Sequence, residues 1–141
     1  MRKSLAGLLA VAAVFYSGPA RAGDGERRPH LALRATPHVA FSPVEIFAIG
    51  ELKGGHDSEE FYCPGLVWDW GDGSRSAHES DCSPYQDGVR LDRFFSARHA
   101  FRAPGTYAVR LFLIRAGKTL TMATVPIMVF GHFGGGSEPG Y

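Results

Sequence analysis

The stretch LVWDWGDGSRS, Leu66–Ser76, decides which fold the chain can adopt. Trp68 and Trp70 are one residue apart, so in a strand both rings point to one face while Asp69 points to the other. Gly71-Asp72-Gly73 follows directly. Glycine allows the backbone angles of a sharp turn, and aspartate accepts hydrogen bonds from N–H groups of its own turn. The stretch therefore predicts a buried strand that ends in a tight turn.

A Gly-Asp-Gly sequence can also belong to a phosphate loop or a metal loop. A phosphate loop needs a helix N-terminus after the glycines, and no helical period follows in residues 74–84. A calcium loop needs more alternating carboxylates and a bidentate glutamate, which Asp69, Asp72 and the distant Glu79 do not supply. We interpret the segment as a structural turn, with a cation site as the alternative.

On either side of this stretch, short extended runs alternate with polar segments rich in turn residues. Apolar residues recur with period two in these runs, as expected for half-buried strands, and no run has a helical period. The predicted strands lie at 31–35, 44–49, 66–70, 105–114 and 119–130. The pattern predicts an all-β fold, a β-sandwich of two packed antiparallel sheets with about seven strands.

Two features set limits on this sandwich. Pro126 lies within the last predicted strand and cannot donate to a strand ladder, so we expect an edge or a bulge there. Residues 51–60 and 71–88 are polar and turn-rich, which predicts two long loops.

The composition is that of one ordinary globular domain. The 141 residues are 45% hydrophobic with a formal net charge of +1. These values do not fit a disordered chain, and they give no electrostatic basis for binding nucleic acid.

The first 22 residues have the layout of a cleaved secretory signal. Arg2 and Lys3 precede an apolar run at 5–16, and the small-residue site Ala20-Arg21-Ala22 follows. A membrane anchor, the alternative, needs about 20 apolar residues. We expect export to the periplasm or the extracellular space, with no membrane insertion after cleavage. The expected organisation is signal 1–22, polar lead 23–30, sandwich domain 31–130 and Gly-rich tail 131–141.

The chain has two cysteines, Cys63 and Cys82. In an oxidising compartment an even pair predicts one disulfide. The bond would close a loop of about 20 residues around the tryptophan-rich stretch and stabilise the fold by roughly 3 kcal/mol. A catalytic cysteine paired with a histidine is the alternative.

Two blocks of the sequence resemble the PKD (polycystic kidney disease) domain family. That family has the pattern Trp-Asp-Phe-Gly-Asp-Gly, followed downstream by His-x-Tyr, a Pro-Gly turn and Thr-Tyr-x-Val-x-Leu. Here the matching positions are Trp68, Asp69, Trp70, Gly71, Asp72 and Gly73, and then His99, Phe101, Pro104, Gly105, Tyr107, Val109 and Leu111. Trp70 replaces the usual Phe and Phe101 the usual Tyr, and the segment 74–98 is longer than is common. The resemblance spans 31–129 and implies an immunoglobulin-like β-sandwich.

The histidines do not indicate a metal site. The resemblance implies a buried hydrogen-bonding role for His99, and the other histidines lack ligand spacing. His56 lies beside Asp57, Glu59 and Glu60, which we interpret as a solvated acidic loop. We predict no cofactor and no metal.

We expect no enzymatic activity, because the chain has neither a Gly-x-Ser-x-Gly nor a His-Glu-x-x-His motif. The resemblance implies a secreted, non-catalytic module that contacts protein or carbohydrate at a cell surface or envelope. Outward-facing apolar side chains and two tyrosines near the disulfide are the candidate contact residues. They are Phe47, Ile49, Phe112, Tyr62 and Tyr85. The alternative is that some of them pack under the long loops.

Two other classes of function stay open. One is a structural or assembly subunit of an exported complex that pairs through its edge strands. The other is a small exported hydrolase that uses His99 or His78 with Asp72 or Asp81.

Overall fold

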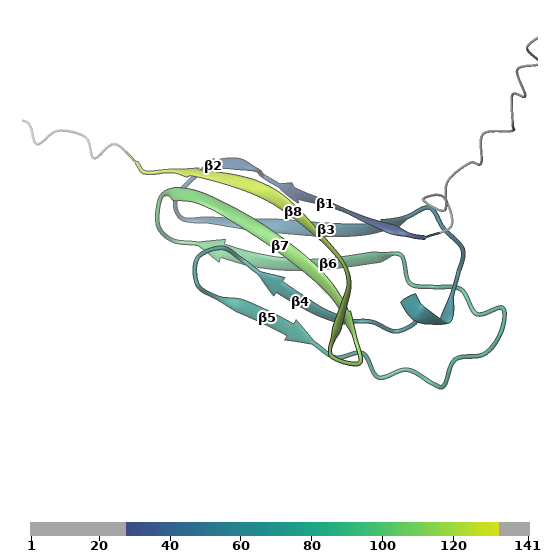
Figure 1. Cartoon of the computed structure of the whole chain (residues 1–141). Coiled ribbons are helices and arrows are strands. Elements are labelled where there is room, and N and C mark those ends of the chain that lie inside the picture. Colours follow the sequence, from purple (N-terminus) through teal and green to yellow (C-terminus); the bar gives the residue numbers. More distant parts are fainter. Residues whose placement is uncertain (1–27, 133–141) are drawn as a thin grey trace, which may run out of the picture.

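The computed structural model describes residues 28–132 (Figure 1). The expected signal peptide, most of the polar lead and most of the Gly-rich tail lie outside the described residues. The described chain is all-β: eight strands and one short 3-10 helix, with no α-helix. The strands are β1 (His30–Thr36), β2 (Val39–Phe41), β3 (Val44–Lys53), β4 (Gly65–Asp69), β5 (Arg75–His78), β6 (Phe94–Phe101), β7 (Gly105–Arg115) and β8 (Lys118–Phe130), and the 3-10 helix is η2 (Glu59–Phe61).

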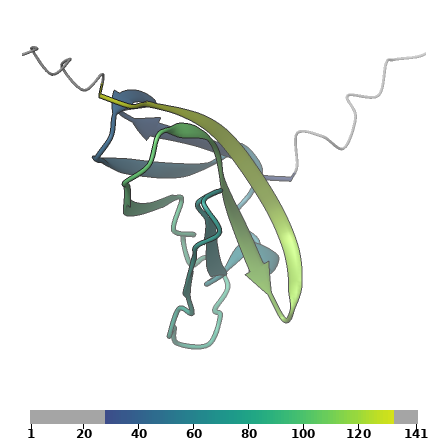
Figure 2. The ribbon, with the colours of Figure 1, turned by 90° about the vertical axis from the view of Figure 1, so that its left-hand side faces the viewer.

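The strands form two sheets that pack on each other. One sheet has three strands in the order β1-β3-β6, and the other has five in the order β2-β8-β7-β4-β5. The larger sheet is curled, and Figure 2 shows the curvature along β7 and β8.

One apolar core fills the space between the sheets. On β1, β3, β4 and β7 its members lie on the apolar faces that the period-two pattern predicted, with Ile46 of β3 and Leu111 of β7 fully buried. Other members, such as Phe61 and Leu91, lie outside the predicted strands. The sheets pack closely at Gly50, where a Cβ atom would lie 2.4 Å from Leu111 Cδ2. The buried apolar residues are Leu31, Ala35, Ile46, Ala48, Leu52, Phe61, Trp68, Trp70, Leu91, Phe95, Phe101, Val109, Leu111, Leu113, Ile127 and Val129.

The structure corrects three details of the predicted sandwich. Eight strands are present: β2 and β6 lie outside the five predicted runs, β5 lies within the predicted loop 71–88, and Pro37 separates β1 in one sheet from β2 in the other. The sheets are not wholly antiparallel, since β2 pairs parallel to β8. Residues 51–53 belong to β3, whereas the sequence predicted a loop from 51 onward. Burial of Leu52 continues the inward alternation of β3 to that point.

Pro126 lies where β8 has an open edge. It pairs with Ala108 of β7 on one side, while β2 pairs only with Met128–Phe130 on the other. The Met128 N–H donates to the His38 carbonyl oxygen on the β2 side. The Pro126 nitrogen faces the same side, because alternate residues of a strand point the same way. The edge expected at Pro126 is therefore present, and the bulge of this hairpin lies elsewhere, between Leu113 and Ile114.

The turn predicted after Trp70 is present. Gly71 and Gly73 have positive φ angles of 79° and 90°. Asp69 Oδ1 accepts from the Gly71 N–H at 3.1 Å, and Asp72 Oδ1 accepts from the Ser74 N–H at 2.9 Å. The turn therefore uses its glycines for backbone angle and its aspartates as hydrogen-bond acceptors.

The two glycines of this turn should differ in their tolerance of alanine. Both have a positive φ, which costs about 1–2 kcal/mol for a residue with a side chain. At Gly71 a Cβ atom would also lie 2.8 Å from the Ala108 backbone, whereas at Gly73 it would meet nothing within 4 Å. We expect Gly71→Ala to lower the free energy of unfolding by about 1–3 kcal/mol more than Gly73→Ala, measured by urea unfolding. Equal losses would contradict the close approach to β7.

Candidate functional site

Five aromatic rings form a column that joins the two sheets. The rings of Trp68 and Trp70 are parallel with centroids 5.5 Å apart, and His99 of β6 stacks on Trp70 at 4.5 Å. Phe101 meets His99 edge-on at 4.9 Å and lies against Tyr107 of β7 at 4.2 Å. All five belong to the two sequence blocks that resemble PKD domains. The blocks are therefore brought together in space by direct ring contacts.

Three polar contacts tie this aromatic column to the surrounding backbone and side chains. His99 Nε2 lies 2.7 Å from Asp72 Oδ2, and the Tyr107 hydroxyl donates to the Ala103 carbonyl oxygen at 2.6 Å. The indole N–H of Trp70 donates to Ser76 Oγ at 2.9 Å. His99 thus has a hydrogen-bonding role, as expected, and its side chain is mostly buried.

The pKa of the Asp72 carboxyl reflects its surroundings. Partial burial raises this pKa. Hydrogen bonds from the Ser74 hydroxyl, His99 and the Ser74 N–H lower it, as does the charge of protonated His99, and together they outweigh the effect of burial. The net effect lowers the pKa of Asp72 from 3.8 to about 2. The carboxylate is therefore fully ionised at neutral pH.

The arrangement around Asp72 does not match a hydrolytic triad. In such a triad the histidine stands between the carboxylate and the nucleophile. Here Asp72 is in the middle, because the Ser74 hydroxyl donates to Oδ1 at 2.5 Å while His99 contacts Oδ2. His99 therefore has no position from which to activate Ser74. His78 and Asp81, the other pair considered, are both exposed.

The residues proposed from the sequence as a contact surface do not form one patch. Phe47 and Ile49 lie on the outer side of the three-stranded sheet, and Phe112 lies on the outer side of the five-stranded sheet. All three are half-buried. Each lies on a central strand, where neighbours on both sides cover it. Phe112, for example, stands between Val67 and Met122. Only Tyr62 and Tyr85 of the five are in contact.

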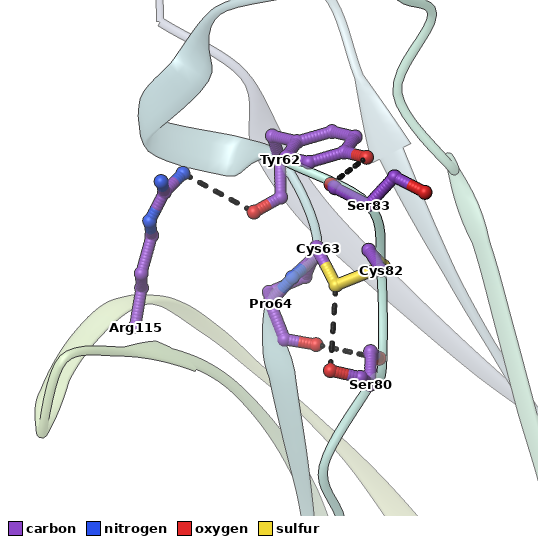
Figure 3. Close-up of a disulfide and its surroundings, with 7 residues drawn as sticks. All are labelled: Tyr62, Cys63, Pro64, Ser80, Cys82, Ser83 and Arg115. Carbon is purple, nitrogen blue, oxygen red and sulfur yellow. Dashed lines mark hydrogen bonds between the residues drawn. A yellow bond between two sulfur atoms is a disulfide. The ribbon is translucent and has the colours of Figure 1, made fainter. Parts of the chain in front are cut away.

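Tyr62 and Tyr85 lie beside a disulfide, as the sequence predicted. Cys63 and Cys82 are joined with an S–S distance of 2.06 Å and a Cα–Cα distance of 6.2 Å. The bond links the segment before β4 to residues 79–93, the connection between β5 and β6, which we call the stapled loop (Figure 3). A disulfide in this position is compatible with an oxidising, exported compartment.

Further contacts hold the stapled loop against the sandwich. The Tyr62 hydroxyl donates to the Ser83 carbonyl oxygen at 2.7 Å, and the Ser80 hydroxyl donates to the Pro64 carbonyl oxygen at 3.1 Å (Figure 3). Arg115 of β7 donates from Nη1 to the Tyr62 carbonyl oxygen at 3.2 Å. Cys63 Sγ also lies 3.5 Å from the Ser80 carbonyl oxygen, but a disulfide sulfur has no proton to donate.

The two tyrosines meet edge to face, with centroids 5.4 Å apart. Both are half-buried, so each ring keeps an accessible part. A hollow of about 280 Å³ and a neighbouring one of about 490 Å³ open beside them. The hollows are lined by carboxylates, hydroxyls, an amide and a guanidinium, among them Glu59, Ser80, Asp81, Gln86, Asp87 and Arg115. The site combines a rigid aromatic pair with polar groups, a combination that is common in recognition surfaces.

The acidic residues around His56 are largely paired with arginines. Asp57 accepts from Arg93 at 2.7 Å, and Glu59 lies 3.6 Å from Arg115. Across residues 28–132, no group of three or more histidine, cysteine or acidic side chains is placed to hold a metal ion.

Sequence reasoning missed the most exposed apolar side chains. They are Val39, Phe41, Phe94, Met122, Met128 and Phe130. The run 119–130 did contain a sign of this exposure. Apolar residues occur there at both odd and even positions, so one of the two sets had to face outward. Exposure follows from position at a sheet edge, which the alternation alone does not reveal.

No family model matches the chain, and its sequence matches no curated protein. In the described part of the chain, no helix is long and apolar enough to cross a bilayer.

Acid should weaken the fold through Asp72. Its pKa is 3.8 in the unfolded reference and about 2 in the folded protein. Its contribution to stability is therefore complete above about pH 4 and is lost as the pH falls towards 2. We expect the difference in free energy of unfolding between wild type and Asp72→Asn, from urea unfolding at a series of pH values, to shrink across this window. A difference that stays constant would contradict the assignment.

The disulfide should contribute substantially to stability. It closes a loop with a sequence separation of 19, which corresponds to roughly 3 kcal/mol in the chain-entropy model. We expect the double variant Cys63→Ser, Cys82→Ser to lose about that much free energy of unfolding, as should reduced wild type. A thiol assay on the denatured, oxidised protein should find no free thiol, and two reactive thiols would contradict the bond.

Proposed function

We propose that this chain is an exported, non-catalytic binding module with an immunoglobulin-like, PKD-like fold. Its stapled loop would contact a protein or a carbohydrate at the cell surface or envelope. The observation that carries the proposal is the Tyr62–Tyr85 pair, held at the surface by the Cys63–Cys82 bond and by the Tyr62–Ser83 hydrogen bond.

Three features of the strands support the immunoglobulin-like assignment. The strand orders β1-β3-β6 and β2-β8-β7-β4-β5 suit a sandwich in which consecutive strands cross between sheets. The short β2 leaves the first sheet and joins the last strand. Tyr107 lies near the start of β7 and bonds back to the Ala103 carbonyl oxygen, as the tyrosine corner of such domains does.

The PKD-like assignment is supported by the contacts of the motif residues. His99 of the second block stacks on Trp70 and bonds to Asp72 of the first block. A motif whose parts interact in this way has a structural reason to occur as a pair. These contacts give the resemblance a physical basis in addition to the sequence pattern.

Loop position and composition support a binding role. Loops at the end of a rigid sandwich are where such domains usually bind, because the sheets fix the loop ends while the tips can vary. The stapled loop contains Ser, Tyr, Gln, Asp and Gly in the sequence ESDCSPYQDG, residues 79–88. Tyrosine provides contact area with little loss of side-chain entropy, and the polar residues provide hydrogen bonds.

The assembly-subunit alternative is favoured by one feature. Within the described chain, β6 pairs only with β3, so its other edge is open along its eight residues. An open edge can pair with a strand of another chain. The Phe94→Glu variant, on β6, tests this alternative.

Binding through the stapled loop should depend on Tyr85. The test uses oxidised protein, immobilised and screened against a glycan array and against the secreted and envelope proteins of its native cells. We expect Tyr85→Ala to remove at least about 90% of the specific signal, since aromatic anchors dominate such interfaces. Phe94→Ala is the matched control, because Phe94 is an exposed aromatic that lines neither hollow beside Tyr62.

Two results would contradict the proposal. One is a wild-type protein that is folded and disulfide-bonded but gives no specific signal in either screen. The other is a signal that Tyr85→Ala leaves intact although the variant unfolds at the same temperature as wild type.

A further inference from the structure

A second surface lies at the end of the larger sheet where β2 pairs with β8. Val39, Phe41, Met128 and Phe130 form it, and we call these four side chains the end patch. They are 49%, 55%, 47% and 46% exposed. Val39 pairs with Met128 and Phe41 with Phe130 across the two strands, and the two phenylalanine rings lie 5.9 Å apart.

The end patch is a consequence of alternation in β8. Ile127 and Val129 point into the core, so Met128 and Phe130 must point out. Val39 and Phe41 point out from β2, which is the edge strand of this sheet and only three residues long. In the described chain no further strand covers them on that side.

The size of the end patch suits a protein interface. If a large side chain has roughly 200 Å² of surface, four that are about half exposed present on the order of 400 Å². Two such patches in contact would bury about 800 Å². The outer column of β8 continues the surface through Pro126, Thr124 and Met122, all of them exposed. This brings the total to at least the roughly 1,000 Å² that a specific interface needs as a minimum.

The chemistry of the end patch selects the partner. None of its four side chains is charged, so these side chains could form no salt bridge with a charged partner. The matching surface is another uncharged apolar face, and each copy of this chain presents one.

The geometry favours contact through faces over contact through edges. The open edge of β8 contains Pro126, which has no N–H to offer an incoming strand. Strand addition is therefore blocked there, whereas side chains on the outer face remain free to pack against a second sheet face.

We propose that the end patch is the interface of a homodimer, in which two copies pack these faces on each other about a two-fold axis. The proposal stands on the end patch and does not depend on the function of the stapled loop.

Dimerisation here would leave both stapled loops accessible. Along β7, Gly105 pairs with Val129 beside the end patch, whereas Ile114 pairs with Gly65, two residues after Cys63. The patch and the stapled loop thus lie at opposite ends of β7. If the loop binds a partner as proposed above, the dimer would bind repeated partners with both loops at once and gain avidity.

Sedimentation velocity tests the dimer. The protein is produced from its full coding sequence in an oxidising compartment, with its N-terminus read by mass spectrometry, and is run from about 1 μM to about 1 mM. We expect a reversible monomer–dimer equilibrium in the micromolar range. Phe41→Glu and Met128→Glu should each weaken it at least about 100-fold, because each places a charge in the centre of an apolar contact.

Phe94→Glu is the matched control, since Phe94 is 67% exposed but belongs to β6 of the other sheet. It should leave the dimer intact. Circular dichroism checks that each variant folds. If an end-patch variant does not fold, Phe41→Ser is used in its place. A wild type that stays monomeric at every concentration would overturn the proposal, as would a dimer that survives both end-patch variants. Loss of the dimer in Phe94→Glu alone would overturn it in favour of pairing through β6.

Discussion

The stacking of His99 on Trp70 is the contact on which the rest of the structure depends. It is made between sheets, because His99 comes from β6 and Trp70 follows β4. The contact places Asp72 within reach of the imidazole, which fixes the turn after Trp70. It also continues through Phe101 to Tyr107, where the hydroxyl ties the start of β7 to Ala103. One column of rings thus sets the spacing of the sheets and the position of two turns.

The same contacts occupy the polar side chains of the motif region. Asp72, Ser74 and His99 are groups that a catalytic site would use, but here their polar atoms are engaged with one another. The low pKa of Asp72 reflects those hydrogen bonds and does not indicate a group ready to transfer a proton at neutral pH.

The two surfaces we consider functional are built in different ways. The stapled loop is polar and gains its order from a covalent bond and backbone-directed hydrogen bonds. The end patch is apolar and gains its order from the ladder between β2 and β8. A loop of this length would lose much conformational entropy on binding if it were free, so the disulfide reduces that cost in advance. The hydrogen-bonded ladder between β2 and β8 likewise holds the end patch in place and so reduces the conformational entropy lost on binding.

The sequence by itself determined five of the eight strands, the inward faces of β1, β3, β4 and β7, the Gly-Asp-Gly turn and the disulfide. These follow from local rules: alternation decides which side of a strand is apolar, glycine decides where φ can be positive, and a single pair of cysteines can form one disulfide. The sequence also placed Tyr62 and Tyr85 near the disulfide, because they are neighbours of its cysteines along the chain.

Only the tertiary structure decided which apolar residues are exposed. Phe112 and Phe130 are alike in the sequence, since both alternate with buried residues of a strand. Phe112 lies on a central strand and is covered by Val67 and Met122, whereas Phe130 has only the short β2 beside it and stays 46% exposed. Strand order also decided that β2 runs parallel to β8 and that His99 reaches Asp72. These depend on contacts between residues far apart in the chain, which local alternation does not encode.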